Sequence, residues 1–198
     1  MAPIIVDSSK VHEFARFDDF YNWLAEHHAA EDEVWIRIFK KASGRPTISP
    51  TEAIDAALCW GWIDAIRKSW DEQSFVQRYV PRGRKSVWSQ VNRDNVERLI
   101  AEGKMTEHGL RPVEAAKADG RWDAAYRIGM EPPADLFAAI EASPAAKATY
   151  EILTSQNRFA LTFRLAAIKT PAGRERKIRS FVEMLERGET IYPQKLQK

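Results

Sequence analysis

The alternation of side chains that is typical of strands stops near Pro81, and this change constrains the fold more than any other feature. Three segments before that point have strand-like patterns: 33–41, 62–70 and 74–80. In the first of them, Val34, Ile36 and Ile38 alternate with Trp35, Arg37 and Phe39. After Pro81 the apolar residues recur at helical spacing instead, so the second half of the chain is predicted to be helical.

Helices are predicted on both sides of these strands. In the first half one covers residues 18–28, with Asp18 as its N-cap. A second begins at Ser49-Pro50-Thr51-Glu52, which combines a capping residue with Pro at the first helical position, and stops at Gly61. In the second half helices are expected at 89–100, 106–117, 132–141, 143–155, 157–169 and 171–186. Gly120–Met130 fits neither period and is assigned as a linker or a docking segment.

These patterns predict the α+β class, with a small antiparallel sheet and helices in the N-terminal half, packed against a helical C-terminal half. The expected halves are residues 1–85 and 86–198, within one compact unit. A chain of 198 residues is long enough to bury a substantial core.

Composition argues against several classes of protein. The formal net charge is only +2, so the overall charge gives no reason to expect binding to nucleic acid. No apolar run is long enough to cross a membrane, and the N-terminus does not resemble an export signal, so we expect a cytoplasmic protein. The single cysteine, Cys59, forms no intramolecular disulfide and is expected to be a small buried apolar residue. The four histidines lack metal-ligand spacing and no phosphate-binding glycine loop occurs, so we expect neither a metal nor a cofactor.

One segment of about thirty residues concentrates indoles, an acid and several arginines. Its candidate ligand-binding residues are Trp60, Trp62, Asp64, Arg67, Gln77, Arg78, Arg82, Ser86, Trp88, Ser89 and Asn92. Indoles form apolar walls, whereas guanidinium groups beside a helix N-terminus are suited to bind phosphate or carboxylate. The segment therefore predicts a cleft for a small anionic or aromatic ligand.

The same segment resembles a known family. The runs Cys59–Asp64, Gln77–Arg82 and Ser86–Ser89, with further matches at Arg98–Met105 and Phe181–Glu189, are similar to the YdeI/OmpD-associated family, also called bacteriocin-protection proteins. The similarity extends from about Glu33 to Pro193. It implies a role in resistance to antimicrobial peptides or to other envelope stress, and it does not imply a particular reaction.

Several interpretations of these residues stay open. Asp64 can bind a ligand, or it can form a structural ion pair with Arg67 or Arg78. The basic stretch around Arg82 can bind an anion, or it can be a solvated loop. We expect a binding module without catalytic residues; the alternatives are an enzyme that uses Asp64 as acid or base, a nucleic-acid-binding module and a protein-interaction module with an unknown partner.

Overall fold

The computed structural model describes residues 5–126, 132–166, 168 and 170–194. The chain forms two compact units, residues 1–127 and 128–198. The first residues of the chain and residues 127–130, which end the expected linker or docking segment, lie outside the described part. The α+β class is confirmed, because all the strands of the described residues lie in the N-terminal half and the C-terminal half is helical.

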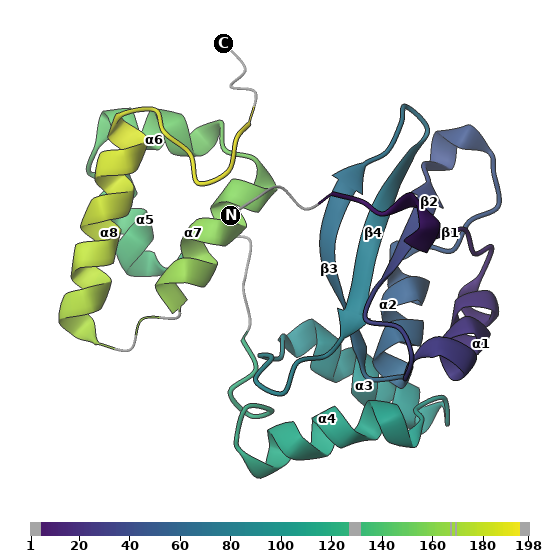
Figure 1. Ribbon diagram of the computed structural model, residues 1–198. Coiled ribbons are helices and arrows are strands. Elements are labelled where there is room, and N and C mark those ends of the chain that lie inside the picture. Colours follow the sequence, from purple (N-terminus) through teal and green to yellow (C-terminus); the bar gives the residue numbers. More distant parts are fainter. Residues whose placement is uncertain (1–4, 127–131, 167, 169, 195–198) are drawn as a thin grey trace. The chain divides into compact units, whose positions relative to one another are not determined.

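The described residues of the first unit form a four-stranded sheet and four α-helices. Figure 1 shows how these elements are arranged. Its elements are η1 (Ser8–Lys10), β1 (Val11–His12), α1 (Phe17–His27), β2 (Val34–Phe39), η2 (Lys41–Ser43), α2 (Pro50–Cys59), β3 (Trp62–Ser69), β4 (Ser74–Pro81), α3 (Gln90–Ala101) and α4 (Glu107–Ala118). The strand order is β1-β2-β4-β3. The predicted strands pair antiparallel, β2 with β4 and β4 with β3, as expected. The sheet as a whole is mixed, however, because β1 pairs parallel with β2.

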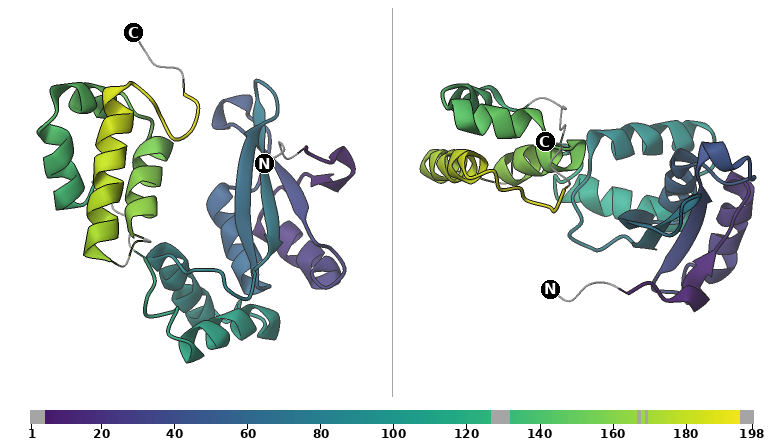
Figure 2. Two further views of the ribbon diagram at one scale, coloured as in Figure 1. Left: turned by 60° about the vertical axis from the view of Figure 1, so that its left-hand side comes forward. Right: turned by 90° about the horizontal axis from the view of Figure 1, so that it is seen from above.

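Helices α1 and α2 supply the main core over one face of the sheet (Figures 1 and 2). Phe20 of α1 and Ala56 of α2 are fully buried, together with Ile36, Trp62 and Tyr79 of the strands. Strand β2 is covered on both faces, since five of its six residues are buried. Burial of both faces explains why apolar residues occur on both sides of its alternation.

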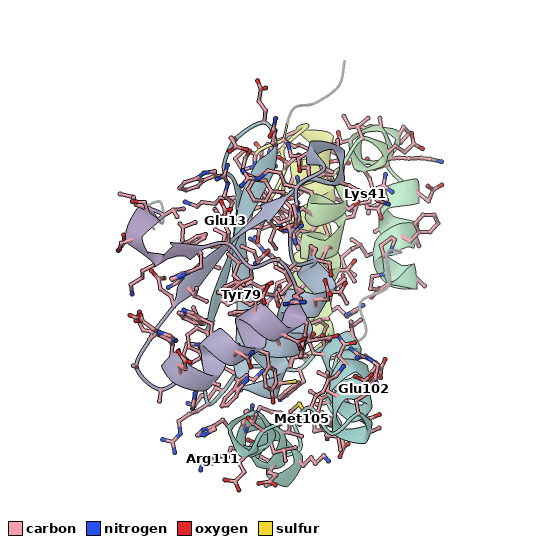
Figure 3. The ribbon with its side chains drawn as sticks, turned by 90° about the vertical axis from the view of Figure 1, so that its right-hand side faces the viewer. Glu13, Lys41, Tyr79, Glu102, Met105 and Arg111 are labelled. Carbon is pink, nitrogen blue, oxygen red and sulfur yellow. The ribbon has the colours of Figure 1, made fainter. Side chains whose placement is uncertain are left out.

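Helices α3 and α4 pack on α2 and form a second core. The start of α4 lies against the end of α2: the carbonyl of Cys59 accepts hydrogen bonds from the backbone N–H and the hydroxyl of Thr106, at 3.1 and 2.6 Å. A side chain at Gly109 would place its Cβ 2.3 Å from the same carbonyl oxygen, so only glycine permits this approach. Figure 3 shows Met105 and Arg111 at the end of the first unit opposite to Lys41.

Local sequence explains where most helices begin. Ser49 forms the predicted capping box with Glu52, and Ser89, Thr106 and Ser143 each accept a backbone N–H as N-caps. The predicted cap of α1 is wrong: the N-cap position is Arg16, and Asp18 lies in the first turn, where its charge still favours the helix dipole.

The described residues of the second unit form four helices around their own apolar core. They are α5 (Ala134–Glu141), α6 (Pro144–Glu151), α7 (Ser155–Ala166) and α8 (Pro171–Glu186). Helix α8 contacts the other three, and Phe181 and Leu185 bring its apolar side into the core (Figure 2). Asn157 links α7 to the segment after α8, because its side chain donates to the carbonyl of Tyr192 and accepts the Tyr192 N–H.

Candidate functional site

The hairpin of β3 and β4 positions the acid of the candidate site. Asp64 lies opposite Tyr79, and an irregularity of the register follows before Arg67 pairs with Gln77. A bulge of this kind redirects side chains, and it brings Arg67 to the strand position beside buried Gln77. There the guanidinium Nε of Arg67 donates to Gln77 Oε1 at 2.9 Å. Arg67 also lies over the ring of Phe75, with 4.4 Å from its central carbon to the ring centroid.

Asp64 is half-buried, and among the residues that the structure describes it makes no ion pair. Removal from water raises the pKa of its carboxyl above the ordinary value, and the positive charges of Arg67 and Arg82 oppose this shift. Tyr79 and Tyr126 lie close enough for the Asp64 charge to raise the pKa of each phenol, although burial is the larger cause. The carboxyl of Asp64 is therefore the acidic centre of a group of tyrosines and arginines.

Arg82 follows β4 and is held by backbone and ring contacts. Its own N–H donates to the carbonyl of Gly61 at 2.9 Å. Its guanidinium lies 3.6 Å from the centroid of the Trp88 ring and donates through one terminal nitrogen to the carbonyl of Val87 at 3.1 Å. The Nε atom is buried without a hydrogen-bond partner, and burial lowers the pKa of Arg82 to about 10 although Asp64 opposes the change. No carboxylate of the described residues forms an ion pair with this cation.

A second guanidinium lies near the first. Arg121 donates to the carbonyl of Ser86 at 2.8 Å, so consecutive carbonyls of one loop hold Arg121 and Arg82. Arg121 lies close enough to Arg82 for its charge to lower the pKa of Arg82. Unlike Arg82, Arg121 has a carboxylate partner, Asp119, at 2.8 Å. Two cations and few compensating acids give this loop a positive local charge.

The start of α3 closes the same loop. Trp88 is 1% exposed and packs edge-on against Trp122, with ring centroids 4.9 Å apart. The N–H of Tyr126 donates to the carbonyl of Trp88 at 3.0 Å. The Ser89 hydroxyl is the N-cap of α3 and accepts the backbone N–H of Asn92 at 3.1 Å, so the start of the helix already uses it.

The remaining predicted residues lie apart from this group. Trp62 is 1% exposed in the main core, and half-buried Trp60 packs at the end of α2 against the rings of His28 and His108. Arg78 is the neighbour of Gln77 on β4 and therefore points to the other face of the sheet. There its Nε donates to Glu33 at 2.5 Å. The structural pairing of Asp64 with Arg67 or Arg78 is thus absent among the described ion pairs.

The fold thus brings six of the predicted residues near one another, through the contacts given above: Asp64, Arg67, Gln77, Arg82, Ser86 and Trp88. Reasoning from the sequence missed Arg121, Trp122 and Tyr126 as neighbours of Arg82. The pair Arg121-Trp122 repeats the combination of guanidinium and indole that singled out Arg82 and Trp88, and this repetition could have indicated it. Within the described part of the chain, no group of three His, Cys, Asp or Glu side chains could hold a metal ion.

Two family models match different parts of the chain. Residues 12–112, just over half of the 198 residues, match the model described as Domain of unknown function (DUF8412). The chain belongs to this family. The DUF8412 match includes the second residue of β1, the whole of β2 to β4, and most of the residues around Asp64 and Arg82, whereas Arg121 and Tyr126 lie beyond it.

Residues 129–188 match the family described as Bacteriocin-protection, YdeI or OmpD-Associated. The resemblance drawn from the sequence is thereby confirmed, over a shorter span than expected: this match covers α5 to α8, and the segment from Cys59 to Asn92 falls in the DUF8412 match. No curated protein and no solved structure matches the chain. Within the described residues, none of the helices has the length and apolar character required to cross a membrane.

Proposed function

We propose that the first unit is a cytoplasmic binding module for a small anionic ligand, which contacts the guanidinium group of Arg82. The observation that carries this proposal is the state of that group: it is partly buried on Trp88, it has an Nε without a partner, and it lacks a carboxylate partner among the described residues. A cation that has lost part of its hydration and keeps unused donors gains from a bound anion. Arg121, held by the preceding carbonyl of the same loop, adds a second guanidinium group, although its ion pair with Asp119 balances part of that charge.

The proposal also assigns a biological role. The match of residues 129–188 to the bacteriocin-protection family supports a contribution to resistance against antimicrobial peptides or a related stress. In this proposal the first unit binds a small anion, and the second unit links this binding to resistance.

Binding is tested by titrating the full chain with inorganic phosphate, adenosine monophosphate and benzoate, using calorimetry. Replacement of Arg82 by Gln is expected to weaken the affinity for the anion by about 10- to 150-fold, since a hydrogen bond to a charged group contributes about 1.5–3 kcal/mol. Arg84→Gln is the matched control: it removes the same charge from an exposed position of the same loop and is expected to leave binding unchanged. If none of these anions binds, or if both variants lose affinity equally, Arg82 is not the anchor.

One observation favours a second candidate, an enzyme that uses Asp64 as acid or base. The raised pKa of Asp64 moves it toward the range that proton transfer requires. An anion that binds at Arg82 would be incubated with the chain and followed by NMR for chemical conversion. Conversion by the wild type and its loss in Asp64→Asn, with binding retained, would support the enzyme; an unchanged ligand supports the binding module.

A further inference from the structure

A cavity of about 450 Å³ opens at the end of the sheet, where β2 and η2 lead into α2. Its walls are largely apolar and come from Ile38, Phe39, Ile48, Pro50 and Phe75. Small-molecule sites typically have volumes of about 300–1,000 Å³ and mostly apolar walls with a few polar groups, so this cavity has the usual size and character. It shares no residue with the group around Asp64 and Arg82.

The hydroxyl groups of the cavity are already used by the fold. Thr47 Oγ1 accepts the backbone N–H of Phe39 at 3.2 Å. Ser49 Oγ accepts the N–H of Glu52 at 3.2 Å, as part of the capping box of α2. These acceptors would lose their present partners if they turned to a ligand, so they do not favour a strongly polar occupant.

The two lysines of the cavity supply the charge that remains available. Lys40 donates from its ammonium group to the carbonyl of Glu72 at 2.8 Å, and Lys41 is exposed. Neither forms an ion pair with a carboxylate among the described residues. Figure 3 shows Lys41 at the end of the first unit remote from Arg111.

Two further cations lie against aromatic walls of the cavity. The guanidinium of Arg45 lies 3.9 Å from the centroid of the Phe39 ring, and that of Arg67 lies 4.4 Å from the centroid of the Phe75 ring. Glu13 compensates part of this charge, because it pairs with Arg45 at 3.4 Å. Two of the aromatic walls are thus covered on part of their surface by cations, which disfavours a cationic occupant.

We propose that this cavity binds a small monocarboxylate with an aliphatic or aromatic body. The apolar body enters between Ile48 and the two phenylalanines, and the carboxylate stays at the mouth beside Lys40 and Lys41. The cavity is a second site, and it goes beyond the anion site proposed at Arg82.

The test uses ¹H–¹⁵N spectra of the full chain, titrated with octanoate, hexanoate, 4-phenylbutyrate and the neutral alcohol 4-phenylbutanol. Saturable shifts are expected at the amides of Lys40, Lys41 and Thr47. Each methylene that enters the cavity is expected to strengthen binding about fourfold, so octanoate binds more tightly than hexanoate. The octanoate and 4-phenylbutyrate titrations together distinguish an aliphatic from an aromatic preference.

Lys41→Gln is expected to weaken both carboxylates by about two- to fivefold, the contribution of an exposed ion pair, and to leave the alcohol unchanged. Lys85→Gln, at an exposed position remote in sequence from the cavity, is the matched control and changes nothing. Arg82→Gln is also expected to leave carboxylate binding in the cavity unchanged, so the experiments test the two proposed sites independently. The proposal is overturned if no carboxylate shifts these amides, if hexanoate and octanoate bind equally, or if the alcohol binds as tightly as the acid.

Discussion

Replacement of Gly61 by Ala is expected to destabilise the first unit by about 2–5 kcal/mol, as the sum of two structural costs. The backbone of Gly61 has φ 74°, in the left-handed region where a side chain costs about 1–2 kcal/mol. An added Cβ would also lie 2.6 Å from the carbonyl oxygen of His108 in α4. Pro112 lies four residues after His108 and has no N–H to donate to that carbonyl. Displacing this backbone group is comparable to overpacking a core, which costs about 1–3 kcal/mol.

Gly103→Ala separates the two costs. Gly103 has φ 67°, but nothing lies within 4 Å of a Cβ placed there. This control is therefore expected to lose only the conformational part, about 1–2 kcal/mol. Both substitutions restrict the unfolded chain in the same way, so that effect cancels in the comparison.

The assay is urea unfolding of the full chain, followed by tryptophan fluorescence. All seven tryptophans belong to the first unit, so the emission reports the unfolding of that unit. The expected result is a lower free energy of unfolding for Gly61→Ala than for Gly103→Ala, by about 1–3 kcal/mol, at an unchanged dependence on urea. Equal losses would refute the close approach of α4 to the end of α2.

Three further predictions concern charges and a helix cap. Asp64→Asn is expected to raise the melting temperature at pH 7, because a raised pKa in the folded state means that ionised Asp64 opposes folding. The increase in melting temperature should become smaller as the pH falls through the folded-state pKa of Asp64 toward its unfolded value of about 3.9. Equal melting temperatures of the variant and the wild type at pH 7 would contradict this prediction. Burial, and secondly the charge of His28, lowers the pKa of His108, so the folded state favours the neutral imidazole. The free energy of unfolding is therefore expected to be highest above about pH 6.5 and to fall as the pH drops below that value. In NMR titrations His28→Gln should raise the pKa of His108, and an unchanged value would exclude the coupling. Ser49→Ala removes the acceptor for the Glu52 N–H and should cost about 1 kcal/mol in the urea assay, whereas a cost near zero would mean that the capping box does not stabilise α2.

Features coded by neighbouring residues were the ones that could be predicted. The start of α2 depends on Ser49, Pro50 and Glu52 alone, and the strands β3 and β4 depend on alternation within eight residues each. The two-residue strand β1 is too short to show any period, so its parallel pairing with β2, and hence the mixed sheet, could not be foreseen.

Features that depend on distant contacts were predicted less well. Composition indicated that indoles and arginines matter, but it does not distinguish an indole that fills a core, such as Trp62, from one at a surface. The neighbours of Arg82 come from as far along the chain as Arg121 and Tyr126, and they meet through the loop carbonyls and the bridge between Ser89 and Tyr126. No local pattern encodes that meeting, and the alternation along β4 separates Arg78 from it.

The burial of Cys59 has a practical consequence. The side chain is fully buried, its carbonyl is bound by Thr106, and burial raises the pKa of the thiol to about 12. A thiol that hardly ionises at neutral pH does not react with maleimides or iodoacetamides. Spectroscopic probes can therefore be attached selectively: a cysteine introduced at an exposed position such as Lys85 would take up the dye or spin label, and the native thiol need not be replaced.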